Sequence, residues 1–133
     1  MQSIKTSVLI VDDDEDVRRL LGRQVSSIGH DVVVVDSGEE ALTIVSDQEF
    51  DLIFIDHMMP GLSGYDTIHQ LRAKGCKSKI VVITASKEDQ IFDQFLDSDL
   101  AIDGFLNKPF DLGQVERCLE TILSRGGKFL SPS

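Results

Sequence analysis

One stretch, Leu52-Ile53-Phe54-Ile55-Asp56-His57-Met58-Met59-Pro60-Gly61, decides the fold. Its four leading apolar residues, bounded by Asp51 before and Pro60-Gly61 after, are typical of a strand buried on both faces of a parallel sheet. Open α/β sheets bind ligands at the carboxyl ends of such strands, and Asp56 stands at that end. An Asp before a Pro-Gly turn is also common for local reasons. The stretch alone therefore leaves Asp56 open as a reactive carboxylate or as the first polar residue of a turn.

The composition indicates one small globular domain. A chain of 133 residues has room for a single core, so we predict one domain over 1–133, with its core over about 6–125 and a short tail over 126–133. The 13 basic and 23 acidic residues give a net charge of −10, which argues against direct nucleic-acid binding. No apolar run approaches the roughly 18 residues that span a bilayer, and no signal peptide is evident. We expect no membrane insertion and a cytoplasmic protein.

The two cysteines are predicted to be reduced structural thiols. Cys76 and Cys118 are far apart in sequence and fit neither a CxxC motif nor a metal-ligand spacing.

Apolar runs alternate with helical patterns along the chain. Short runs rich in β-branched residues predict strands over 8–11, 32–35, 52–55, 80–83 and 104–106. Apolar residues at helical spacing predict helices that include 17–28, 41–45, 65–71, 87–97 and 112–123. This alternation predicts an α/β fold, a doubly wound five-stranded parallel sheet of the flavodoxin-like (βα)5 type. The simplest strand order is 2-1-3-4-5.

In that order, polar residues from four strand ends meet at one edge. Strands one and three are neighbours at the switch point, which brings Asp12 and Asp13 beside Asp56. Thr84 and Lys108 end strands four and five on the same rim. Each has an ordinary alternative: a solvated helix start for the two aspartates, a turn cap for Thr84 and a surface lysine for Lys108. A shared crevice is favoured because each residue independently falls at the end of its own strand.

Such a crevice suits phosphoryl chemistry. Three carboxylates this close together require raised pKa values or a hard divalent cation, and Mg²⁺ fits best because it prefers oxygen ligands. A carboxylate is also a nucleophile towards phosphorus and forms an aspartyl phosphate. A metal, the Lys108 charge, the Thr84 hydroxyl and backbone amides would neutralise the developing charge. His57 and Met58-Met59 have no partner spaced to complete a metal or redox site and are taken as loop and packing residues.

These motifs together resemble the receiver domain of two-component response regulators, over nearly the whole chain. The resemblance is carried by Val11-Asp12-Asp13, by Asp56 with Met59-Pro60-Gly61 and Gly64, by Thr84-Ala85, and by Lys108-Pro109-Phe110. It implies that Asp56 accepts a phosphoryl group from a phosphohistidine. It further implies that Mg²⁺ is bound by Asp13, Asp56 and the backbone carbonyl of Met58, while Asp12 acts mainly through water.

The resemblance also implies a switch. Lys108, the Thr84 hydroxyl and the Ala85 amide would bind the phosphoryl group, and the Lys108-Pro109 bond is usually cis in such domains. When Thr84 moves onto the phosphoryl group, the aromatic residue of strand five, here Phe105, turns inward. That shift remodels the face formed by helix four, strand five and helix five. Phe105 stands where many relatives have Tyr, and Ala101-Ile102 where a Gly-Ala pair is common, so this output face departs most from the family.

The leading hypothesis is a phosphorylatable switch that acts through protein partners. The phosphoryl donor would be a sensor histidine kinase or a histidine phosphotransfer protein, the downstream partner is a protein, and the chain would be a monomer or a phosphorylation-dependent dimer. It is not expected to be an enzyme, beyond catalysing its own dephosphorylation. A free-standing regulator, a relay intermediate and a receiver excised from a longer chain all stay open.

Two alternatives come from other classes. A Mg²⁺-dependent phosphatase of the haloacid dehalogenase type needs a second Asp two residues after the nucleophile, and that position is Met58. A pseudo-receiver that binds proteins without being phosphorylated is disfavoured because all five reactive positions are present.

Overall fold

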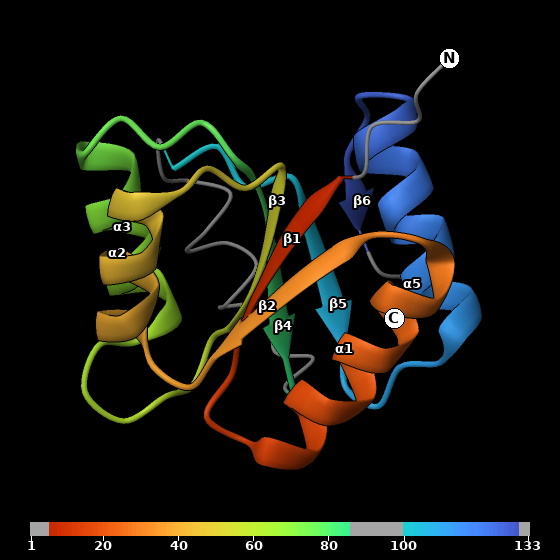
Figure 1. Ribbon diagram of the computed structural model, residues 1–133, viewed down its shortest axis with the longest axis horizontal. Coiled ribbons are helices and arrows are strands. Elements are labelled where there is room, and N and C mark those ends of the chain that lie inside the picture. The colour runs from red at the N-terminus through yellow and green to blue at the C-terminus, as the bar shows by residue number, and fades with distance from the viewer. Residues whose placement is uncertain (1–5, 86–99, 131–133) are drawn as a thin grey trace.

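The computed structural model describes residues 6–85 and 100–130, which form one sheet between two layers of helices (Figure 1). The strands are β1 (Ser7–Val11), β2 (Asp31–Val35), β3 (Leu52–Asp56), β4 (Lys79–Thr84), β5 (Gly104–Asn107) and β6 (Phe129–Leu130). The helices are α1 (Glu15–Ile28), α2 (Gly38–Asp47), α3 (Gly64–Ala73) and α5 (Leu112–Leu119), and α5 runs on into a π-helical turn (Glu120–Ser124). The helix predicted over 87–97 lies outside the described residues.

The sheet has the predicted order and one strand more than predicted. Its strands run β2-β1-β3-β4-β5-β6, all parallel to their neighbours, so the order 2-1-3-4-5 is confirmed for the first five. The sixth strand lies in the segment that was predicted only as a short tail. The backbone N–H of Phe129 donates to the carbonyl of Asp103 at 2.9 Å, and a Cβ on Gly104 would lie 2.6 Å from the Phe129 carbonyl oxygen. Glycine at position 104 is therefore what lets the tail approach β5.

The core is divided by the sheet into two apolar clusters. α2 and α3 cover one face, and α1 and α5 cover the other (Figure 1). Ile53 and Ile55 of β3 pack in the first cluster, while Leu52 and Phe54 pack in the second. Successive strand residues point to opposite faces, so the unbroken apolar run of β3 is needed to fill both layers. The four apolar residues of β3 are buried, as the sequence predicted, and Asp56 at its end is buried as well.

The helices start and stop at residues with suitable cap chemistry. The side chains of Asp14, Ser37 and Ser63 each accept a backbone N–H from the first turn of α1, α2 and α3. Gly29 ends α1 in the left-handed conformation, with φ of 111°. These caps satisfy backbone groups at the helix ends and so help to define where each helix begins or stops.

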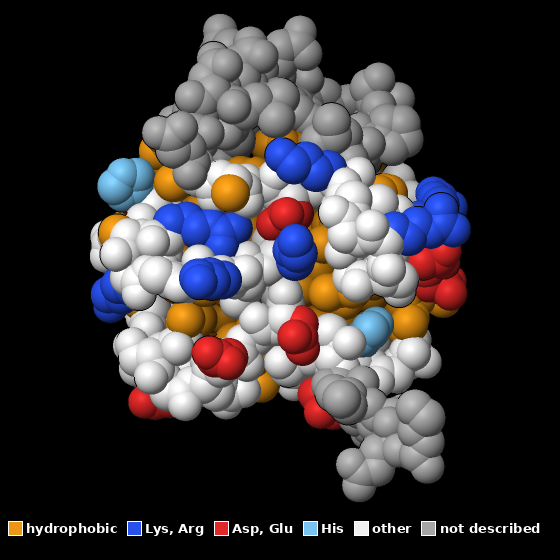
Figure 2. Space-filling model, turned by 90° about the horizontal axis from the view of Figure 1, so that it is seen from above, with side chains coloured by type: hydrophobic (Ala, Val, Ile, Leu, Met, Phe, Trp, Pro, Cys, Tyr) orange, Lys and Arg blue, Asp and Glu red, His pale blue; other side chains and the backbone are white. Residues whose placement is uncertain are grey.

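The two edges of the sheet differ in character. Strands begin at the edge seen in Figure 2, where basic, acidic and hydrophobic side chains meet near the middle of the face. They end at the opposite edge, which carries the predicted site. None of the helices within 6–85 and 100–130 is long and apolar enough to cross a membrane.

Candidate functional site

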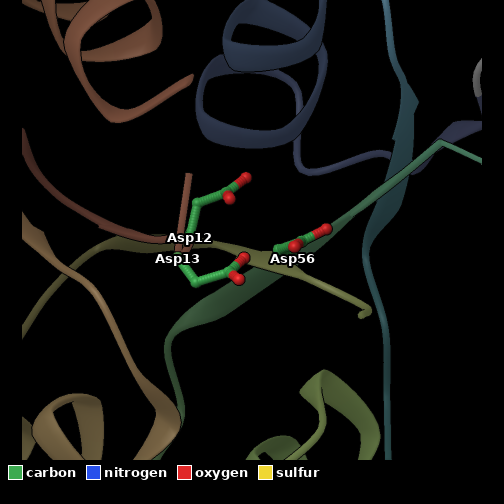
Figure 3. Close-up of side chains that lie close together, drawn as sticks. All are labelled: Asp12, Asp13 and Asp56. Atoms are coloured by element: carbon green, nitrogen blue, oxygen red, sulfur yellow. The ribbon is translucent and has the colours of Figure 1, made fainter. Parts of the chain in front are cut away.

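Three carboxylates meet where β1 and β3 end. Asp12 and Asp13 directly follow β1, and Asp56 is the last residue of β3, the neighbouring strand (Figure 3). One oxygen from each carboxylate lies within 4.8 Å of the others. Asp12 is fully buried and Asp56 is 5% exposed, while Asp13 is exposed. The predicted juxtaposition of these three residues is therefore present, with Asp13 on the solvent side.

Lys108 brings a positive charge to the same place. It directly follows β5, and its Nζ lies 3.1 Å from Oδ2 of Asp12 and 3.5 Å from Oδ1 of Asp56. Its backbone N–H donates to the carbonyl of Thr84 at 2.8 Å, which ties the ends of β4 and β5 together. The Lys108-Pro109 peptide bond is cis. One ammonium faces three carboxylates, so when all are ionised the cluster keeps a net charge of about −2.

Asp12 is held in place from several sides. Its Oδ1 accepts the backbone N–H of Asp14 at 2.9 Å, and its own backbone N–H donates to the carbonyl of Val35 at 3.3 Å. Arg18 on the first turns of α1 reaches back and donates from Nη1 to the Asp12 carbonyl at 2.8 Å. Sequence reasoning did not assign Arg18 a role, although its place on the first turns after the acidic run was a usable signal. Hydrogen bonds within the loop, from α1 and to β2 thereby fix the loop between β1 and α1.

Burial and mutual repulsion shift the titration of the cluster. Burial raises the pKa of the Asp56 carboxyl to about 6, the Asp12 charge adds to this shift, and Lys108 opposes it. Burial also raises the pKa of Asp12, against the Asp14 N–H and the Lys108 ammonium. For Lys108, burial acts to lower the pKa, but the carboxylates of Asp56 and Asp12 outweigh it and raise that pKa. The buried aspartates thus carry unfavourable charge that a further cation would relieve.

The donor atoms fit a hard divalent cation. Oδ2 of Asp12 is buried, and its counter-charge among the described residues is the Lys108 ammonium, whose Nζ lies 3.1 Å away. All the available donors are carboxylate oxygens, which Mg²⁺ prefers, and exposed Asp13 leaves room for the waters that Mg²⁺ retains.

The phosphate-binding and switch residues lie where the strand ends place them. Thr84 is the last residue of β4 and is 1% exposed, whereas Ala85 after it is exposed. Phe105 is fully buried in the cluster that lies on the α2 and α3 side of the sheet. Of the two methionines expected to be loop and packing residues, Met59 is buried in that same cluster, whereas Met58 is a loop residue with 71% of its surface exposed. The proposed metal-binding role of the Met58 backbone carbonyl stays a prediction.

The loop after Asp56 is closed against the start of α3. The backbone N–H of Gly64 donates to the carbonyl of His57 at 3.0 Å, and His57 in turn donates its backbone N–H to the Ile83 carbonyl at 2.9 Å. A Cβ on Gly64 would overlap the Asp56 carbonyl oxygen and lie 2.9 Å from the Cα of His57. Glycine at position 64 therefore permits a backbone approach that fixes the position of the Asp56 main chain.

Arg72, to which the sequence analysis gave no role, ties together the segments that precede β4 and β5, at the edge where the strands begin. Its guanidinium donates to the carbonyls of Leu100 (2.8 Å), Cys76 (2.9 Å), Ser78 (2.8 Å) and Ala101 (2.9 Å). Two of these oxygens lie four and six residues after Arg72, and the other two lie 28 and 29 residues after it. No local pattern signals such a cluster, because carbonyl acceptors carry no residue preference.

Comparison with known proteins places the chain in a family. A family model for the response regulator receiver domain matches residues 8–120. The alkaline phosphatase synthesis transcriptional regulatory protein PhoP of Bacillus subtilis is 36% identical over 118 residues, which cover 89% of this chain and 48% of that protein. The chain spans about half the length of the curated relatives it matches.

Solved structures show the same architecture. The signal receiver domain of a modulated diguanylate cyclase from Desulfovibrio desulfuricans G20 is 31% identical, with a TM-score of 0.80 over 92% of this chain and 96% of that one. The response regulator TrrA of Thermotoga maritima, solved in complex with Mg(2+)-BeF, is 28% identical, with a TM-score of 0.77 over 89% of this chain and 99% of that one. With the family model covering most of its length, the chain belongs to the response regulator receiver domain family.

Proposed function

We propose that this chain is a phospho-accepting signalling switch and that Asp56 takes the phosphoryl group. The observation that carries the proposal is the position of Asp56: a nearly buried carboxylate at a strand end, facing one ammonium and two further carboxylates. Its pKa of about 6 leaves it mostly ionised at pH 7, which a nucleophile requires.

In the transfer step, an Oδ of Asp56 attacks the phosphorus of a phosphohistidine. A P–O bond forms, the P–N bond breaks, and the electron pair of that bond stays on the imidazole nitrogen of the donor. Lys108 already lies 3.5 Å from Oδ1 of Asp56, so its ammonium is in reach of a phosphoryl oxygen carried there. Charge neutralisation is the main demand of phosphoryl transfer, and Lys108 would supply part of it.

Asp13 and Asp56 would hold Mg²⁺ directly, together with the backbone carbonyl of Met58, and Asp12 would act mainly through water. When bound, the metal ion supplies positive charge against the carboxylates and the phosphoryl oxygens. The mutual proximity of the three carboxylates, which a single ammonium does not neutralise, supports this set.

The Thr84 hydroxyl and the Ala85 amide would complete the phosphoryl site. We further propose that movement of Thr84 is coupled to a repacking of Phe105, which remodels the face that contains β5 and α5. Both side chains are buried, which favours discrete packings over continuous adjustment. The part of that face predicted over 87–97 lies outside the described residues.

The partners in this proposal are a sensor histidine kinase or histidine phosphotransfer protein upstream and a protein downstream. A monomer or a phosphorylation-dependent dimer fits this role, and the cytoplasm is the compartment we propose. The chain would not be an enzyme in its own right, apart from assisting its own dephosphorylation. The phosphatase alternative is disfavoured because Met58 stands where the second Asp of that chemistry is required.

Thermal unfolding with Mg²⁺ and beryllofluoride tests the proposal. Mg²⁺ should raise the melting temperature of the native chain, and beryllofluoride, which mimics the phosphoryl group on a carboxylate, should raise it further only with Mg²⁺ present. Asp56→Asn should lose the beryllofluoride response, Asp13→Asn should weaken the Mg²⁺ response, and Glu49→Gln, an exposed carboxyl at the opposite edge, should keep both. A ligand at 100 times its Kd stabilises by about 2.7 kcal/mol, which is readily measured. Equal beryllofluoride responses in the native chain and Asp56→Asn would refute the role of Asp56.

A further inference from the structure

A hollow lies at the edge where the strands begin, opposite the carboxylate cluster. It has a volume of about 1160 Å³ and is bounded by the end of α2, the loop before β3, the loop between α3 and β4, and the π-helical turn after α5. Its apolar lining includes Leu42 and Val45 of α2 and Leu123 of that turn, all of them partly buried. The hydrophobic surface near the middle of Figure 2 lies on this face.

A lysine cluster borders the same hollow. Lys74, Lys77 and Lys79 all line it, and in Figure 2 basic side chains gather near the centre of this face. No ion pair within the described residues engages any of the three. Lys74 and Lys77 are exposed.

The local charge has the opposite sign to that of the whole protein. Three lysines and the two acids that line the hollow, Glu49 and Asp51, sum to +1, whereas the chain carries −10. Asp51 is already engaged, because its Oδ2 accepts the backbone N–H of Ser7 at 2.9 Å. The net negative charge of the protein therefore repels an acidic partner over most of the surface, but not at this hollow. Such a difference in local charge directs a partner to one docking site.

The polar groups in the hollow favour a peptide over a small polar ligand. The Ser78 hydroxyl donates to the Phe50 carbonyl at 2.6 Å, and the Cys76 thiol lies 3.4 Å from that hydroxyl. Within the part of the chain that the structure describes, no buried side-chain oxygen or nitrogen lining the hollow lacks a partner. Small-molecule sites depend on a few convergent polar groups, and here the basic side chains without an ion pair to a described residue are the three lysines, of which Lys74 and Lys77 are exposed and none is buried.

We infer that this hollow is a docking site for an acidic, amphipathic peptide segment of a partner protein, with apolar anchors in the hollow and carboxylates at the lysines. The inference does not depend on phosphoryl transfer. β4 runs for six residues between Lys79 at this edge and Thr84 at the other, a separation of roughly 16 Å at the usual rise of a strand. A segment bound here leaves the carboxylate cluster free, so both edges can be occupied at once.

The test uses a displayed library of random 12-residue peptides, selected on the native chain. Binding of each selected peptide is then measured on Lys74→Glu/Lys77→Glu, on Val45→Ser, and on the control Arg23→Glu/Lys128→Glu, which makes the same charge change at exposed positions outside the hollow. We expect the selected peptides to combine Asp or Glu with Leu, Ile or Phe. Their affinity should fall at least tenfold for the lysine variant and should also be lower for Val45→Ser. The control should keep at least a third of the native affinity.

Three outcomes would overturn the inference. The first is that no peptide distinguishes the lysine variant from the control. The second is that the peptides that bind the lysine variant more weakly than the control are not acidic. The third is self-association of the native chain that the lysine variant abolishes, since that would assign the face to a second copy. Phosphorylation by acetyl phosphate should be unchanged in the lysine variant, which confirms that its fold and its carboxylate cluster are intact.

Discussion

Replacing Asp56 by Asn should stabilise the protein when no metal is present. Asp56 is 5% exposed, its pKa is raised from 3.8 to about 6 by burial and by the Asp12 charge, and Lys108 only partly compensates. A carboxyl whose pKa is higher in the folded state binds more protons there than in the unfolded chain. Stability from this group is therefore greatest below its unfolded pKa and is lost as pH rises through the folded pKa.

The size of the effect follows from the shift. About two pKa units correspond to about 3 kcal/mol of lost stability above pH 7, and about half of that at pH 5. Asp56→Asn keeps the shape and removes the charge, so it should recover up to this amount. For a chain of 133 residues, that is a rise in melting temperature of about 10 °C at pH 7.5.

Urea unfolding in EDTA at pH 7.5 and pH 5 measures the free energy of unfolding directly. Glu49→Gln, which removes an exposed carboxylate, should change it by less than about 0.5 kcal/mol at both values. The reasoning fails if Asp56→Asn is neutral or destabilising at pH 7.5, or if its gain does not shrink at pH 5.

Three further predictions concern single positions. Ala101 has a φ of 57°, a conformation that costs a residue with a Cβ about 1–2 kcal/mol, so Ala101→Gly should raise the free energy of unfolding by about 1 kcal/mol in urea, and a loss of that size would contradict the strain. Gly64→Ala should destabilise by about 1–3 kcal/mol because its Cβ would overlap the Asp56 carbonyl, and an unchanged urea midpoint would show that the loop adjusts freely. Burial raises the pKa of Cys118 to about 12, so a thiol reagent at pH 8 should modify partly exposed Cys76 and leave Cys118 intact until the protein unfolds, and rapid modification of both in the native state would contradict this.

The fold could be predicted because each strand carries its own signal. β3 is buried on both faces, and its apolar run predicted that directly. Each of the site residues Asp12, Asp56, Thr84 and Lys108 stands at the end of such a run, so the parallel topology alone assembled them at one edge. Two details could not be predicted from the sequence because they depend on side-chain conformation. Asp13 is exposed, and Lys108 lies closer to Asp12 than to Asp56.

What the sequence missed depends on contacts between distant segments. β6 is two residues long, too short to show a period, and it exists because Gly104 admits the backbone of Phe129. The carbonyls that Arg72 binds are equally invisible, because any residue supplies a carbonyl. Ala101 is an intermediate case: the resemblance flagged it as standing where glycine is common, and its positive φ gives the physical reason.

The claim that Asp56 accepts a phosphoryl group is tested most directly by intact mass after incubation with acetyl phosphate and Mg²⁺. The account predicts that one phosphoryl group is added to the native chain, and that none is added to Asp56→Asn or to the native chain in EDTA. Addition of the same mass to Asp56→Asn, or to the native chain in EDTA, would contradict the assignment of the acceptor or of the metal.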